Sequence, residues 1–118
     1  MNIEELREFC LSLDKVTEGL PFGPTVLVFK VCNKMFLLAA LDTHPFQFNA
    51  KCDPDEAIAL RERYSSVLPG YHMNKSHWNT ILINGEVNDI ELKVWILNSY
   101  KLIVATLPKK IQLTVKQP

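Results

Sequence analysis

Three short runs of β-branched and aromatic residues follow one another between residues 24 and 49, and they restrict the fold more than any other part of the sequence. The runs cover residues 24–31, 35–41 and 46–49, and the pair Cys32-Asn33 separates the first two. The third run alternates between apolar and polar side chains, as expected of a strand with one face on the core. The pattern predicts an antiparallel meander with one face on a hydrophobic core.

Helices are predicted before and after this meander. Apolar residues recur at helical spacing over residues 3–13, and Asn2 followed three positions later by Glu5 is the sequence of a capping box. Asp53-Pro54 begins a second helix, which extends to about residue 65, because aspartate can cap a helix and proline fits its first position. Both helix starts are therefore marked by their capping residues.

The longest predicted helix covers residues 90 to about 106. Asn88 and Glu91 form a capping sequence at its start, and Pro108 follows its end. Its apolar residues cover more than one narrow face, which favours a helix buried deeply against the sheet over one that presents a partner surface. Before it, residues 78–83 are predicted to form a strand that ends in an Asn84-Gly85 turn.

These elements predict an α+β fold in which an antiparallel β-sheet packs against flanking helices. A chain of 118 residues is long enough for one core but hardly for two, so we expect a single domain over residues 1–118. Residues 67–70 follow the second helix and are predicted to prevent it from continuing. Residues 114–118 are expected to form a loose tail.

Charge and apolar runs limit the class of partner. The formal net charge is zero, but residues 1–59 hold five basic and nine acidic residues, whereas residues 60–118 hold eight and four. The second half therefore favours an anionic partner. The longest apolar run, residues 35–41, is far shorter than the roughly 20 residues of a membrane-spanning helix.

The cellular compartment is predicted from the cysteines and from the first residues. The sequence starts with an acidic, amphipathic stretch, which is unlike a signal peptide. It contains three cysteines and no CxxC pair, as expected of reduced thiols. We expect a cytoplasmic protein without membrane contact, in which Cys10, Cys32 and Cys52 are small core residues.

Residues 69–80 combine aromatic, imidazole and basic side chains in one short stretch. Flat rings can stack on bases, and a lysine among them can contact a phosphate, which is the mixture that nucleic-acid surfaces use. Two lysines after the last predicted helix add a second basic site. The candidate binding residues are Tyr71, His72, Lys75, His77, Trp78, Lys109 and Lys110.

Structural roles explain several of these residues as well. Trp78 begins a strand and is most simply a core residue, Tyr71 can hydrogen-bond within its loop, and lysines after a helix complement its dipole. His72 and His77 are five residues apart, and this spacing matches no zinc or iron motif. Nucleophile-elbow and phosphate-binding glycine motifs are absent. We predict no enzyme activity, no metal and no cofactor.

The stretch PGYHMNKSHWNT at residues 69–80 resembles the signature of the MmcQ/YjbR family of small bacterial proteins, and the resemblance covers nearly the whole chain. The other residues that match the family's pattern are Glu18, Pro21-Phe22-Gly23, Phe29-Lys30, Met35-Phe36, Lys51-Cys52-Asp53-Pro54, Ser99-Tyr100 and Leu107-Pro108-Lys109-Lys110. The resemblance implies a compact α+β fold related to the CyaY-like shape, and the family is described as having a double-wing DNA-binding motif.

Two binding functions follow as expectations. In the first, the protein contacts DNA through residues 71–78 and the basic C-terminal end; since the calculated pI is 6.8, the affinity must come from a local patch. In the second, the chain is a protein-interaction or small-ligand module in which His72, Lys75 and His77 bind an anionic group. In either case we expect a monomer or a weak dimer.

Overall fold

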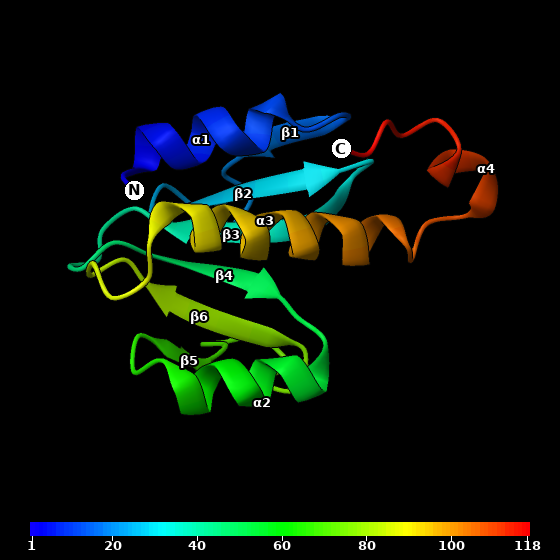
Figure 1. The fold of residues 1–118 in the computed structure, drawn as a ribbon. Helices are drawn as coiled ribbons and strands as arrows, with labels where there is room; N and C mark the ends of the chain where they lie inside the picture. Colours follow the sequence, from blue (N-terminus) through cyan, green and yellow to red (C-terminus); the bar gives the residue numbers. More distant parts are fainter.

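Six antiparallel strands form one sheet in the order β1-β2-β3-β4-β6-β5 in the computed structural model, which describes residues 1–118 (Figure 1). Neighbouring strands pair antiparallel throughout. The strands are Val16–Gly19 (β1), Val26–Val31 (β2), Lys34–Ala40 (β3), Gln47–Lys51 (β4), Val67–Pro69 (β5) and Trp78–Leu82 (β6). The predicted antiparallel meander is therefore present as β2, β3 and β4.

Four helices complete the fold, and the three longer ones pack on one face of the sheet. The helices are Ile3–Ser12 (α1), Pro54–Arg63 (α2), Asp89–Val104 (α3) and Lys109–Gln112 (α4). In Figure 1, α3 crosses the middle strands, α1 lies beside β1, and α2 lies beside β5. The predicted α+β class, with an antiparallel sheet packed against flanking helices, is confirmed.

The core lies between this sheet face and the helices. Tyr100 of α3 is fully buried, packs edge-on against Phe36 of β3 with 5.5 Å between ring centroids, and donates a 2.7 Å hydrogen bond to the Asp14 carbonyl. Ser99 Oγ donates to the Phe36 carbonyl at 2.5 Å and accepts from the Lys51 N–H at 2.8 Å. These bonds attach α3 to β3 and β4, and the predicted deep burial of this helix is confirmed.

The predicted helix starts are also confirmed. Asn2 and Glu5 form a reciprocal capping box, Asp53 accepts hydrogen bonds from two backbone N–H groups, and Asn88 accepts one from Glu91. The first and third helices end one or two residues earlier than expected, and the second ends at Arg63. Helix ends fray, so differences of this size are ordinary.

Two short elements and the C-terminal tail differ from expectation. Residues 67–69, predicted as a break, form strand β5, and α4 follows Pro108 where no further helix was expected. The tail is not loose: Val115 is only 8% exposed and belongs to the core, and the Lys116 N–H donates to Asp14 Oδ2 at 2.8 Å. One apolar residue is enough to anchor such a short segment.

The cysteines follow the prediction only in part. Cys10 is fully buried, whereas Cys32 and Cys52 are half-buried, and all three are free thiols. Cys32 lies in the tight turn between β2 and β3, where it has a positive φ of 48°. None of the helices combines the length and the apolar character that crossing a bilayer would require.

Candidate functional site

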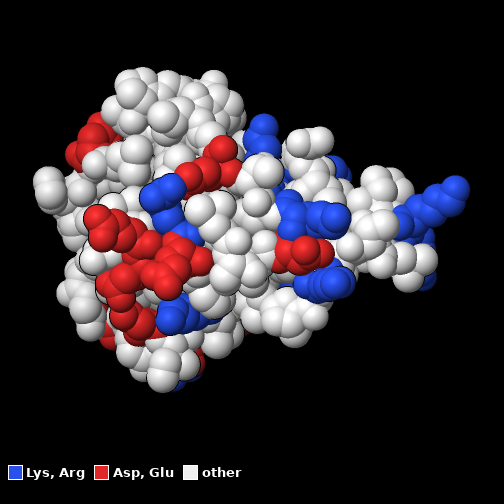
Figure 2. All heavy atoms as spheres, turned by 90° about the horizontal axis from the view of Figure 1, so that it is seen from above, with Lys and Arg blue, Asp and Glu red and all other residues white.

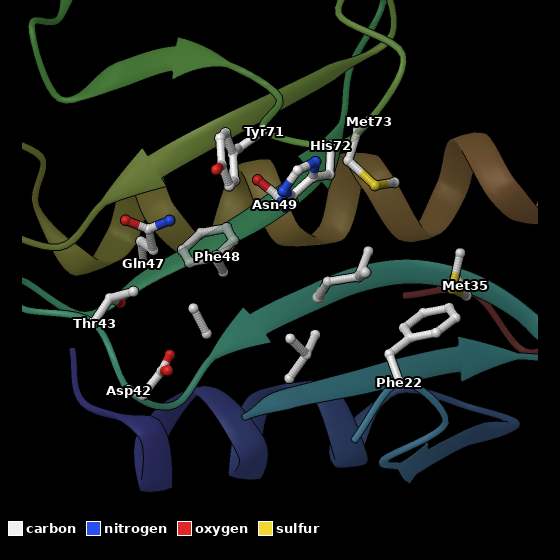
Figure 3. A pocket seen from close by; sticks show the side chains of 13 residues that line it. Phe22, Met35, Asp42, Thr43, Gln47, Phe48, Asn49, Tyr71, His72 and Met73 are labelled. Carbon is white, nitrogen blue, oxygen red and sulfur yellow. The ribbon is translucent and has the colours of Figure 1, made fainter. Parts of the chain in front are cut away.

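The face of the sheet opposite the helices is the floor of a pocket of about 600 Å³ (Figure 3). Side chains alternate between the two faces of a strand. Since Leu37 and Ala39 of β3 belong to the core, Leu38 and Ala40 point to the opposite face. The same alternation places Gln47 and Asn49 of β4 beside them, because Leu38 pairs with Asn49 and Ala40 with Gln47.

Two chain connections form the walls of this pocket. Phe22 comes from the connection between β1 and β2, and Tyr71, His72 and Met73 come from the connection between β5 and β6. In Figure 3 the two groups lie on opposite sides of the sheet floor, with α3 and α1 behind the sheet. Segments far apart in the sequence therefore enclose one space, which is lined mainly by apolar side chains.

Hydrogen bonds and a close backbone contact hold the Tyr71 wall in place. The Gly70 N–H donates to the Trp78 carbonyl at 2.9 Å, and a Cβ on Gly70 would lie 2.8 Å from Trp78 Cβ and from its carbonyl oxygen. The Tyr71 N–H donates to Thr80 Oγ1 at 3.0 Å, and the same hydroxyl donates to Asn49 Oδ1. The wall is thus linked to Asn49 of the pocket floor through the Thr80 hydroxyl.

The far end of the same connection is attached to α2. Arg61 donates from Nε to Asn79 Oδ1 at 2.7 Å and from its guanidinium group to the Lys75 carbonyl. Asn79 also donates to the Ala57 carbonyl at 3.4 Å. The β5–β6 connection is therefore fixed at both ends, which gives the pocket a preformed wall.

Tyr71 and His72 form the aromatic part of that wall. Their ring centroids are 4.0 Å apart and the rings are tilted by 51°. His72 has a positive φ of 59°, a conformation that non-glycine residues adopt rarely and in which histidine is enriched. This backbone turn places the two neighbouring rings against each other instead of on opposite sides of the chain.

The polar groups in the pocket are few and almost all neutral. Asn49 lies near His72, while Gln47 lies toward the end of the pocket that also contains Thr43 and Asp42. Because Asn49 Oδ1 already accepts from Thr80, its amide N–H groups are the part left to face the pocket. The Thr43 hydroxyl is buried without a hydrogen-bond partner. No lysine or arginine lines the pocket.

The structure brings together only some of the residues that the sequence singles out. Tyr71 and His72 line the pocket, and Lys75 is exposed on the same connection. His77 is half-buried, and its carbonyl accepts from the Cys52 N–H at 2.7 Å. Trp78 is half-buried and belongs neither to the hydrophobic cluster nor to the partly buried apolar residues packed against it.

The remaining two candidates lie elsewhere. Lys109 and Lys110 are exposed on α4, which projects from one end of the molecule away from β5 and β6 (Figure 1). The structure therefore separates the predicted patch into two surfaces. It also adds pocket residues that the sequence analysis did not single out, namely Phe22, Asp42, Gln47 and Asn49.

Two of the three thiols are poor nucleophiles. Burial raises the pKa of Cys10 to about 12 and that of Cys52 to about 11. Both are therefore protonated near neutral pH, and the thiolate is the reactive form of cysteine. The structure contains no group of three or more His, Cys, Asp or Glu side chains arranged to hold a metal ion.

Comparison with known proteins gives the family. The YjbR family model matches residues 11–102. The chain belongs to the YjbR family. Among YjbR-family relatives, the uncharacterized protein YbdF of Escherichia coli O157:H7 is 37% identical over 114 residues, covering 96% of this chain and 93% of the relative. The uncharacterized protein YjbR of Escherichia coli K12 is 26% identical, covering 93% of each chain.

Solved structures agree with this assignment to the YjbR family. The Deinococcus radiodurans protein DR2400, described as a DUF419 domain, superposes with a TM-score of 0.93 at 31% identity, covering 99% of this chain and 89% of that one. A Pseudomonas syringae protein superposes with a TM-score of 0.76 at 24% identity, covering 86% and 98%, and at that identity it shows the fold alone. The family resemblance predicted from the sequence is confirmed.

Proposed function

We propose that this YjbR-family protein binds a small molecule, largely through apolar contacts, in the pocket between Phe22 and the Tyr71 wall. The observation that supports this most is the pocket itself. A volume of about 600 Å³ lies within the range of small-molecule sites, which are mostly apolar and contain a few well-placed polar groups. Here the apolar floor and walls surround the amides of Gln47 and Asn49.

The charges around the pocket indicate the charge of the ligand. Asp42 is the only acidic lining residue, and no lysine or arginine is present to neutralise an acid. The Asp42 carboxylate repels an anionic ligand, and moving an anion from water into an apolar pocket without a cationic partner is costly. The ligand is therefore neutral or cationic, and of the residues expected to bind an anion only His72 lines this pocket.

A substitution that fills the pocket tests this proposal. Ala40 is half-buried on the pocket floor, so Ala40→Phe places a ring in the space where a ligand would lie, while Ala59→Phe adds the same ring on the exposed side of α2. With 2-naphthol as a neutral, apolar probe, equilibrium dialysis should show saturable binding that Ala40→Phe weakens by about tenfold or more. Ala59→Phe should bind as the unchanged protein does. Equal affinities in all three proteins would contradict the proposal.

DNA binding is a second proposal, because the surface charge is polarised. Figure 2, in which the molecule is seen from above Figure 1, shows acidic side chains gathered over one half of the surface and basic side chains prevailing toward the end where α4 lies. Lys109 and Lys110 are exposed there, and Lys34 donates to Thr106 Oγ1 near the end of α3. Such a local basic surface supports phosphate contacts, whose affinity falls log-linearly as salt rises. Fluorescence anisotropy of labelled duplex DNA at low and then physiological salt tests this second proposal.

A further inference from the structure

We infer that the ligand of this pocket is an amino-substituted, fused heteroaromatic ring, with the chemistry of an aminopurine as a free base or nucleoside. The inference rests on the proposed small-molecule function and specifies the ligand of that same site. It combines three features: two exposed aromatic walls, two amides in line on the floor, and a polar end with an unpaired hydroxyl.

The aromatic walls favour a flat ligand. Phe22 is 62% exposed and Tyr71 is 65% exposed, although both are large hydrophobic residues, and they lie on opposite sides of the pocket (Figure 3). Exposed aromatic side chains that border one pocket are available to pack on a ligand ring, and stacking between flat rings stabilises a bound base. His72 extends the Tyr71 side of this arrangement.

The pocket floor offers hydrogen-bonding amides for the edge of such a ring. Gln47 and Asn49 are two residues apart on β4, so they share a face and their Cα atoms are about 7 Å apart. A glutamine or asparagine amide pairs in bidentate fashion with an amino group and the neighbouring ring nitrogen, as it does with adenine. Thr80 fixes the orientation of Asn49, which leaves its N–H groups as donors for a second ring nitrogen.

The polar end of the pocket agrees with the same ligand class. The Thr43 hydroxyl, buried without a partner, and the Asp42 carboxylate lie on the Gln47 side of the pocket. Asp42 is an acceptor for an amino group, and the hydroxyl is a donor for a ring nitrogen. A hydrocarbon chain would leave the Thr43 hydroxyl, the Gln47 amide and the Asn49 N–H groups without a partner, which is unfavourable for polar groups taken out of water. The missing lysines and arginines disfavour a nucleotide phosphate.

The test compares adenine with 2-naphthol, which has two fused rings but neither a ring nitrogen nor an amino group. Gln47→Met keeps the length of the side chain and removes its amide, and Gln117→Met makes the same change at an exposed position near the C-terminus. Binding of both ligands to all three proteins is measured by equilibrium dialysis, with the folded state checked by circular dichroism. The quantity of interest is the ratio of the adenine and 2-naphthol affinities.

We expect that Gln47→Met lowers this ratio by about tenfold, whereas Gln117→Met leaves it unchanged. Binding of 2-naphthol without adenine would overturn the heteroaromatic inference but leave the proposed function standing. A ratio of affinities that Gln47→Met leaves unchanged would likewise overturn the heteroaromatic inference and leave the proposed function standing. If neither ligand binds, both the inference and the proposed function fail. An oligo-dA strand that binds more tightly than adenosine would overturn the assignment to a free base or nucleoside.

Discussion

The Thr80 hydroxyl of β6 donates a hydrogen bond to Asn49 Oδ1 of β4, a strand of the pocket floor. The same hydroxyl accepts from the Tyr71 N–H at 3.0 Å. One buried side chain therefore sets the direction of the Asn49 amide and the position of the aromatic wall. The shape and the hydrogen-bonding groups of the pocket depend on each other through this residue.

Replacing Thr80 by valine should loosen the wall, because it keeps the side-chain shape and removes both hydrogen bonds. We expect Thr80→Val to lower the free energy of unfolding by about 1–3 kcal/mol, since the Tyr71 N–H and the Asn49 carbonyl lose their partner. Urea denaturation measures this loss, and faster hydrogen exchange at the Tyr71 amide locates it. The exposed Thr17 supplies the control, and Thr17→Val should change neither quantity.

Glycine should be required at position 70 because a larger side chain has no room there, and not because the backbone needs a conformation that only glycine adopts. A Cβ at this position would lie 2.8 Å from Trp78 Cβ and from the Trp78 carbonyl oxygen, whereas one at Gly19 would meet nothing within 4 Å. Gly70→Ala should therefore destabilise the protein by about 1–3 kcal/mol, and Gly19→Ala by about 0.5 kcal/mol or less. Thermal denaturation compares the two variants. Equal stabilities would show that the Trp78 contact relaxes without cost.

The Arg7–Glu18 ion pair between α1 and β1 should make stability depend on pH. Arg7 donates to Glu18 at 2.8 Å and 2.5 Å, and these hydrogen bonds hold the pKa of the Glu18 carboxyl below its usual range. A carboxyl whose pKa is lowered in the folded state stabilises the protein above its unfolded pKa, and the contribution is lost as the pH falls through the folded pKa. The pair is partly exposed, so the effect is small.

Arg7→Gln should raise the Glu18 pKa toward its usual value, which NMR titration of the side-chain carboxyl measures directly. Urea denaturation should show the variant to be less stable at neutral pH and equal to the unchanged protein in acid. Lys110→Gln, at an exposed position on α4, serves as the control for removing one positive charge. A stability difference that persists below the folded pKa of Glu18 would rule out this linkage.

The basic end of the molecule gives a separate prediction for DNA. Lys109→Glu combined with Lys110→Glu reverses two exposed charges on α4, so it should weaken DNA binding at low salt by about tenfold or more and leave the melting temperature nearly unchanged. Lys75→Glu, which reverses one charge on the β5–β6 connection, is measured beside it and reports whether that second candidate surface also contacts DNA. If duplex DNA binds and the double variant binds it equally well, α4 has no part in the contact.

Much of the fold can be predicted from the sequence because its signals are local. Asn2 and Asn88 cap helices whose free N–H groups lie within three residues, and the alternation over residues 46–49 defines a strand. Strands β1 and β5 and helix α4 have three or four residues each, too few to show a period. Strands β1 and β5 form because β2 and β6 supply their backbone partners, and α4 is held by Gln112, whose side chain donates to the Ala105 and Leu107 carbonyls.

The pocket could be predicted only in part, because its residues meet through the tertiary fold. Tyr71 and His72 stand out by their chemistry, but Phe22 lies on a connection distant in sequence, and no sequence pattern pairs it with them. Gln47 and Asn49 are the polar half of an alternating strand. Polar residues there usually face solvent, and only the two flanking connections convert that face into a pocket.

The central claim is that the pocket on the helix-free face binds a small molecule, and a ¹H–¹⁵N NMR titration with 2-naphthol tests it most directly. We predict saturable shifts of the side-chain amides of Gln47 and Asn49 and of the backbone amides of residues 71–73. The backbone amide signals of Lys109 and Lys110 should not shift. A spectrum that does not change, or shifts confined to α4, would contradict the proposed function.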